Sequence, residues 1–228
     1  MCDIITMIVR DNMKKKTLII IGILVVIISI CVYILYFFNY LPHKKYTNES
    51  FNINKYTSEI DNDNDGIDDQ TDILESARKY ISTNPKYKSK YYGTGYPDDE
   101  YGVCTDVVAF GLLGAGYDIR ELLNEHIKNN RNLYNIDVID KNIDFRRVNN
   151  LKVYFDNTAI SLTTNVKDIE AWQGGDIVVF KKHIGIVSDN RNKKGIPFVI
   201  HHANPYQKEY EEDILEHHND IVGHYRIS

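Results

Sequence analysis

The chain has 228 residues, with 27 Lys and Arg against 32 Asp and Glu, a formal net charge of −5 at pH 7. Proteins that bind nucleic acids neutralise phosphates with clustered basic side chains, so this acidic balance argues against a nucleic-acid partner. The three cysteines are too few for the disulfide framework of a small secreted domain.

An apolar segment over residues 17–38 is long enough to cross a bilayer as a helix. Lysines fill 14–16, and the positive-inside rule then places residues 1–16 in the cytoplasm and everything after the segment outside. A cleaved signal peptide is the alternative, but no small-residue cleavage site follows the run. We expect a single-pass signal anchor in the cell membrane. The protein itself is expected to start at Met1 or at Met13.

Residues 39–60 are polar, without apolar periodicity, and are expected to form a stalk. Residues 61–72 then match a calcium-binding loop, with a glycine at the sharp turn and acidic side chains at alternating positions. The expected ligands are Asp61, Asp63, Asp65, the backbone carbonyl of Ile67, Asp69 and Asp72. A solvated linker rich in Asp and Asn is the alternative. Calcium here would have a structural role.

Apolar residues recur at helical spacing over 73–81, which predicts a first helix. A turn rich in glycine and proline over 91–99 leads to Cys104, which opens an apolar helical run. A tyrosine hydroxyl near this cysteine would be able to hydrogen-bond an oxyanion. The sequence does not choose among Tyr92, Tyr96 and Tyr101.

Cys104 stands at the start of its helix, where backbone N–H groups favour a thiolate and lower the thiol pKa. His183 begins a β-rich run downstream, and a neutral imidazole can accept the thiol proton and return it to a leaving amine. His201 and His202 are candidates to orient that ring, and strand alternation lets one of them face the site. Cys104 as a small buried hydrophobe, among ordinary core histidines, is the alternative.

Asp144, Arg146 and Arg147 form a charged cluster ahead of the strands. Arginine binds carboxylates through two parallel hydrogen bonds, so the cluster is a weak candidate for gripping acidic groups of a peptide substrate. An Asp–Arg salt bridge that ties a helix start is the alternative, and it is slightly favoured.

Short β-rich runs at 176–181, 184–188, 196–202 and 221–227 predict an antiparallel sheet. Helices first and strands afterwards indicate the α+β class for a domain over residues 73–228.

Four motifs carry a family resemblance: GVCTDVV (102–108), NIDFRRVNNL (142–151), HIGIVSD (183–189) and GHYR (223–226). The order of cysteine, His-Ile-Gly-Ile-Val and later histidine resembles the NlpC-type cell-wall cysteine peptidases, a papain-like superfamily. The full set resembles one uncharacterised bacterial domain family within it, over about 71–228. The resemblance implies a papain-like fold with N-terminal helices packed on an antiparallel sheet.

The same resemblance implies Cys104 as nucleophile, His183 as base and His201 as the orienting residue, with His202 as the alternative. The expected activity is that of a membrane-anchored extracytoplasmic peptidase or amidase that cleaves peptide stems of peptidoglycan, without a catalytic cofactor. Acyl transfer, a non-catalytic wall-binding module and a zinc hydrolase that uses Cys104 with several histidines are the alternatives.

Overall fold

The computed structural model describes the backbone of residues 2–227 and the side chains of Arg10 and of residues 13–227. The chain divides into two compact units, Met1–His43 and Lys44–Ser228, and each is described by itself. Met1, one of the two expected starts, lies outside the described residues, as does part of the expected cytoplasmic segment 1–16.

The first unit is essentially one helix, α1 (Cys2–Phe37). Its part from Met13 to Phe37 is long and apolar enough to cross a membrane, and its side chains are exposed within the unit. A membrane-anchoring role for this segment is therefore supported by length and composition.

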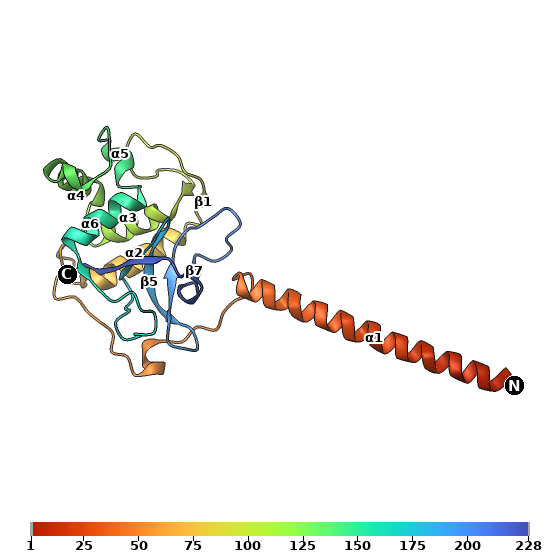
Figure 1. The fold of residues 1–228 in the computed structure, drawn as a ribbon. Coiled ribbons are helices and arrows are strands. Elements are labelled where there is room, and N and C mark those ends of the chain that lie inside the picture. The colour runs from red at the N-terminus through yellow and green to blue at the C-terminus, as the bar shows by residue number, and fades with distance from the viewer. Residues whose placement is uncertain (1, 228) are drawn as a thin grey trace. The chain divides into compact units, whose positions relative to one another are not determined.

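The second unit combines helices with a mixed set of strands. Its helices are α2 (Asp69–Ile81), α3 (Cys104–Gly114), α4 (Ile119–Asn129), α5 (Lys141–Asp144) and α6 (Val148–Thr158). The larger sheet contains β3 (Ile160–Ser161), β4 (Ile177–Phe180), β5 (Ile184–Arg191), β6 (Pro197–Ile200), β7 (Glu211–Glu212) and β8 (Ile221–Arg226). Figure 1 shows α3 to α6 gathered at one end of the unit, beside these strands.

The six strands run in the order β3-β8-β4-β5-β6-β7, and every neighbouring pair is antiparallel. A separate pair, β1 (Lys86–Tyr87) and β2 (Tyr101–Gly102), is parallel and leads directly into α3. The predicted α+β class and antiparallel sheet are confirmed.

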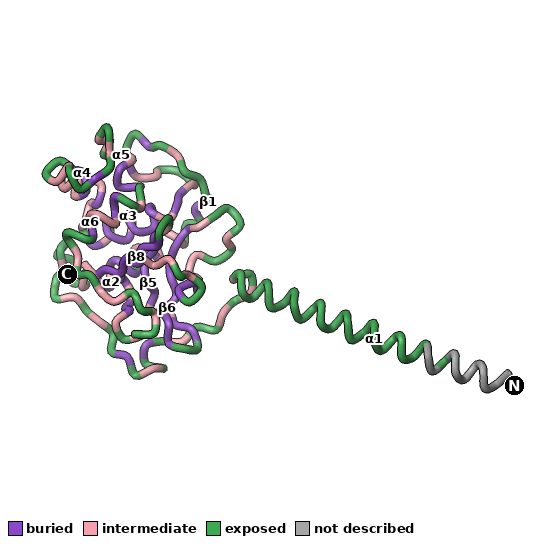
Figure 2. The backbone as a smooth tube through the Cα atoms, viewed as in Figure 1, coloured by how far each residue is buried: buried purple, intermediate pink, exposed green. Residues whose placement is uncertain are grey.

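Alternation along the strands gives the sheet two apolar faces. Ile177 and Ile186 pack in the cluster that the helices cover, whereas their neighbours Val178 and Val187 pack in a second cluster around Trp172. Figure 2 shows the buried backbone running through α2, α3 and the central strands. Because both clusters and all strand pairs lie within 44–228, we expect this unit to fold without α1.

Residues 44–60 belong to the expected stalk, 39–60, but they pack within the second unit. Tyr46 and Arg191 exchange two backbone hydrogen bonds of 2.9 and 2.8 Å, and Ile53 is buried. The fully buried Arg191 guanidinium donates to the Asn48 side chain at 2.5 Å. A buried cation needs such acceptors, and polar composition alone does not reveal that this segment supplies them.

Candidate active site

Cys104 is the first residue of α3, the apolar helix at the centre of the larger core. Val103 precedes it and has no side-chain oxygen for capping. Asp106 replaces that cap, because its carboxylate accepts the Val103 backbone N–H at 2.8 Å. The start of the helix, and with it the position of the cysteine, is fixed by this buried acid.

The Cys104 sulfur lies at the beginning of β5, where it forms a hydrogen bond with the backbone of Ile184, the residue after His183. Burial raises the pKa of the thiol to about 11, and hydrogen bonds from the backbone of Ile184, Thr105 and Cys104 itself only partly oppose that rise. The lowered pKa expected from the helix start is therefore not found. Packing against β5 removes the sulfur from water, and this outweighs the field of the helix terminus.

Three side chains form a line of hydrogen bonds that begins at His183, the residue before Ile184. Nε2 of His183 lies 2.9 Å from Nδ1 of His201, and Nε2 of His201 lies 3.0 Å from a carboxylate oxygen of Glu212. A carboxylate can only accept, so Nε2 of His201 carries a proton and its Nδ1 accepts from Nε2 of His183. This assignment leaves Nδ1 of His183 with its lone pair available.

Both imidazoles of this line are neutral at pH 7. Burial lowers the pKa of His183 to about 3, and the nearby His201 and His218 add to the effect. Burial likewise lowers the pKa of His201 to about 3. The resting site therefore contains a protonated thiol and a neutral imidazole.

The loop after β6 secures the far end of the line. Gln207 lies on this loop, and its amide donates to the His201 carbonyl at 3.2 Å and to the Glu212 carboxylate at 3.4 Å. In turn its oxygen accepts the Ala203 backbone N–H at 2.6 Å. Glu212 and Gln207 were not expected from the sequence, because neither belongs to a recognisable local pattern.

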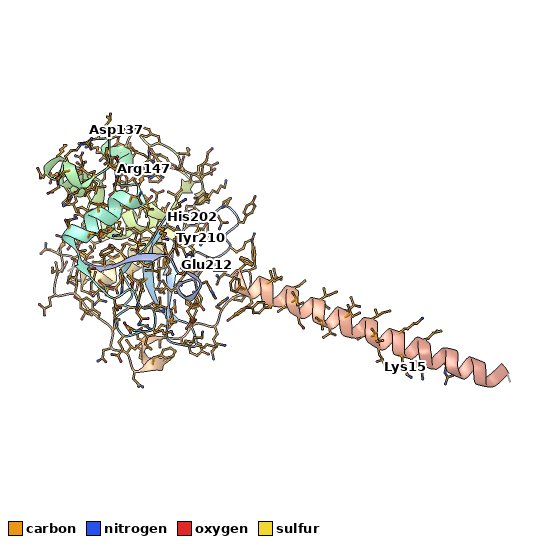
Figure 3. All side chains as sticks on the ribbon, in the orientation of Figure 1. Lys15, Asp137, Arg147, His202, Tyr210 and Glu212 are labelled. Atoms are coloured by element: carbon orange, nitrogen blue, oxygen red, sulfur yellow. The ribbon has the colours of Figure 1, made fainter. Side chains whose placement is uncertain are left out.

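His202 occupies a different position from His201, as strand alternation predicts. Its ring lies between Tyr87 and Tyr210, at centroid distances of 5.2 and 5.1 Å. Figure 3 labels His202 and Tyr210 close to Glu212. Among the described residues no partner accompanies Nδ1 of His202. Of the two candidates, the structure places His201 against His183.

A tyrosine near the thiol is one that the sequence did not single out. Tyr87 lies near enough to Cys104 that the cysteine, after burial, contributes to the raised pKa of the Tyr87 phenol. Tyr92 donates to Asp99 at 2.7 Å, and Tyr96 donates to Asp118 at 2.9 Å. The expected Tyr101 packs its ring under Lys88 and Lys90.

Arg146 lies in a buried ion pair and is not open to a ligand. Its guanidinium donates to both oxygens of Asp106, at 2.7 and 2.8 Å, and both side chains are at most 1 % exposed. The salt-bridge alternative is therefore the one observed, although the acid is Asp106 of α3. Asp144 is buried at the end of α5, where its carboxylate accepts the Asp140 backbone N–H, whereas Arg147 is exposed and lies apart from Glu212 and His202 (Figure 3).

A second buried acid, Asp176, joins the other end of the chain to the sheet. It accepts from His224 at 3.0 Å and from the Arg226 guanidinium at 2.7 and 2.8 Å. The other ring nitrogen of His224 faces the Thr163 carbonyl at 2.7 Å, and the ring stacks on Trp172. Every ring nitrogen of His224 is thus occupied.

The acidic loop forms a separate group. Within the described residues, one group of His, Cys, Asp or Glu side chains brings at least three ligand atoms within 4.8 Å of one another. It consists of Asp61, Asp63 and Asp65. The zinc-hydrolase alternative would need Cys104 and several histidines to converge, and no such group is found among the described residues. Asp69, expected as a calcium ligand, turns away and accepts from Asn62 and Tyr117.

Comparison with known proteins identifies the family. Residues 74–227 match the model of a domain of unknown function, DUF1287. The chain is also 35% identical over 167 residues to the uncharacterized protein YijF of Escherichia coli K12, which covers 68% of this chain and 80% of that protein. No solved structure matches. The chain belongs to the DUF1287 family.

Proposed function

We propose that the unit Lys44–Ser228 is a cysteine hydrolase, a peptidase or amidase that acts through an acyl-enzyme on amide bonds of peptidoglycan peptide stems. The observation that supports this most strongly is the line Glu212–His201–His183, which ends at the residue before Ile184, whose backbone hydrogen-bonds the Cys104 sulfur. A thiol, a base with a free nitrogen and a group that fixes the base are the parts of a nucleophilic site.

In the first step, the Cys104 sulfur attacks the amide carbonyl carbon while its proton passes to Nδ1 of His183. The imidazolium then gives this proton to the leaving amine, the C–N bond breaks and a thioester on Cys104 remains. Water attacks the thioester, transfers a proton to His183 and releases the acid, and the sulfur recovers its proton. Backbone N–H groups at the start of α3 would hold the oxyanion.

The raised thiol pKa specifies how His183 acts. A thiol whose pKa is about 11 carries little thiolate at pH 7, so the proton must leave during attack. His183, neutral at that pH, is able to accept it. The proposed mechanism is therefore general-base catalysis from a neutral pair, and slow alkylation of Cys104 at neutral pH would not by itself indicate an inert cysteine.

The substrate class is supported by the resemblance of the motifs to NlpC-type cell-wall peptidases and by the expected orientation of α1. A segment that anchors the chain with its C-terminal unit outside would place the site next to the wall. Tyr87 and Tyr210, which flank His202 beside the site, offer aromatic and hydroxyl surface for a glycopeptide. Transfer of the acyl group to an amine is the second candidate, since the same thioester serves both reactions.

The test incubates residues 44–228 with purified peptidoglycan and compares the released fragments by mass spectrometry with those from Cys104→Ser. Asp137→Ala is a matched control, because this exposed side chain lies apart from the site (Figure 3). Fragments from the unaltered unit and from the control, and none from Cys104→Ser, would support the proposal and name the bond. Equal fragments from all three, or none from any, would reject it.

A further inference from the structure

The loop before α2 is folded around three carboxylates. Asp61 accepts the backbone N–H groups of Asp65 and Gly66, at 3.1 and 2.9 Å, and the Asp65 carboxylate accepts that of Ile67 at 2.8 Å. Gly66 has φ +93°, a backbone conformation that side chains disfavour. The chain therefore turns sharply and brings the oxygens of Asp61, Asp63 and Asp65 within 4.8 Å of one another.

A fourth carboxylate, that of Asp72, follows the loop in the first turn of α2. Asp72 is only 8% exposed, and among the described residues its Oδ2 has no hydrogen-bond partner. Asp72 stands at the twelfth position of the loop, and the charges of Asp61, Asp63 and Asp65 all act on its carboxylate, so the four carboxylates lie near one another. A buried carboxylate without a partner, beside three like charges, is unfavourable unless a cation joins it.

We propose that this loop binds one Ca²⁺ ion through the carboxylates of Asp61, Asp63, Asp65 and Asp72 and the backbone carbonyl of Ile67. Calcium accepts six to eight oxygen ligands in flexible geometry, whereas Mg²⁺ requires a near-ideal octahedron. Asp69, at the ninth position of the loop, is fully buried and hydrogen-bonded to Asn62 and Tyr117. Water completes the coordination at that position, as in many loops of this kind.

The site lies against the helix that carries Cys104. The Asn62 side chain donates to the Ala115 carbonyl at 3.2 Å, directly after α3, and Tyr117 donates to Asp69 at the start of α2. A Cβ added at Gly116 would lie 2.7 Å from the Asn62 amide, so the loop and the end of α3 approach closely. Calcium would therefore fix the start of α2 against the far end of α3 and stabilise the unit.

The test measures calcium binding and thermal unfolding of residues 44–228 after treatment with EDTA. Calorimetric titration with CaCl₂ should give one site, and saturating calcium should raise the Tm by about 5 °C or more, because a ligand that binds only the folded state stabilises it. Asp65→Asn should weaken binding at least about tenfold, since ligand charge sets the affinity of such sites. Asp137→Asn, which removes an exposed acid elsewhere, should leave binding unchanged.

Asp72→Asn gives the sharper result. Without calcium it should raise the Tm, because it removes a buried charge from beside three others; with calcium it should lose the shift. Absence of a calcium-dependent Tm shift up to about 10 mM, well above the weak affinities of extracellular sites, would overturn the proposal, as would an equal shift with MgCl₂ or with both loop variants. Cys104→Ser should bind calcium normally, so the result is independent of the proposed catalysis.

Discussion

The sheet carries two histidine–carboxylate pairs, and they are built differently. In one, His224 has both ring nitrogens against oxygen acceptors, and its partner Asp176 also binds Arg226. In the other, His201 has Glu212 on one nitrogen and the ring of His183 on the other. Both pairs are buried. Only in the second does the carboxylate determine which ring nitrogens of a further side chain, His183, carry a proton.

The difference separates a structural histidine from one suited to catalysis. With an oxygen atom against each of its ring nitrogens, His224 has no nitrogen to offer to another group. The single carboxylate at His201 instead fixes two neutral rings in one tautomer and leaves Nδ1 of His183 available. Burial and a carboxylate neighbour are thus insufficient as marks of a catalytic histidine; the open nitrogen at the end of the line matters.

The largest expected effect is on activity, and it concerns His183, the open end of the line with His201 and Glu212. His183→Ala should lower the rate of fragment release by about 10³-fold or more, because no other group in the line can accept the thiol proton. Its Tm, measured alongside, shows whether the fold is retained. Rates and Tm are compared for the same preparation. Activity within tenfold of the unaltered unit would exclude His183 as the base.

The second prediction concerns the closed pair. Asp176→Ala should destabilise the unit by about 3–5 kcal/mol, because it leaves the Arg226 guanidinium and a buried ring nitrogen of His224 without their acceptor. Urea unfolding followed by fluorescence measures the change. Asp137→Ala, at an exposed position, serves as the control and should cost less than about 0.5 kcal/mol. Comparable values for the two variants would refute a structural role for the Asp176 cluster.

Glu212→Gln should have an intermediate effect on rate. The amide can donate as well as accept, so the orientation of protons along His201 and His183 is no longer fixed. We expect kcat to fall about 10- to 100-fold, as for other groups that orient a functional histidine, with KM nearly unchanged. Steady-state kinetics on a soluble fragment identified in the wall digest would measure it. A change in KM alone would point to substrate contact instead.

The smallest predicted effect is on stability against pH. The pKa values of His183 and His201 are lowered to about 3 in the folded unit, against about 6.5 when unfolded. Between these values the unfolded chain binds protons that the folded unit does not, so stability falls as the pH drops through this window. From pH 7 to 5.5, His183→Ala should lose less stability than the unaltered unit, by about 1 kcal/mol.

The exposed His217 provides the comparison for that measurement. His217→Gln should follow the pH dependence of the unaltered unit in urea titrations at both pH values. If His183→Ala and His217→Gln lost stability equally, the claim that the site histidines are buried in the neutral form would fail.

Periodicity in the sequence predicts most of the fold. The runs that become α2, α3 and the central strands are apolar at the right spacing, and the structure confirms them. Helix α6 was not predicted, because its apolar residues are interspersed with asparagines that have no helical preference. The packing of residues 44–60 also depends on a partner, Arg191, that lies far along the chain.

The candidate site was predictable only where its residues belong to motifs. Cys104, His183 and His201 follow from their order and neighbours. Glu212 does not, because it lies on a strand of two residues that is placed by pairing with β6. Its neighbour Glu211 turns to Arg78 and Ser188, so composition does not distinguish the two acids.

The raised pKa of the Cys104 thiol could not be predicted from the neighbouring residues in the sequence either. A helix start predicts a lowered thiol pKa, but the depth to which β5 buries Cys104 decides the sign. Burial is a property of the packed unit, and single-sequence patterns report it only for whole faces of helices and strands.

The most direct test of the two-pair comparison is nitrogen-15 NMR of the histidine rings in residues 44–228 at pH 7. Long-range couplings reveal which ring nitrogens carry protons. We predict neutral Nε2–H rings for His183 and His201. A charged His183, or a proton on its Nδ1, would contradict the account, because the nitrogen proposed to receive the Cys104 proton would already be occupied.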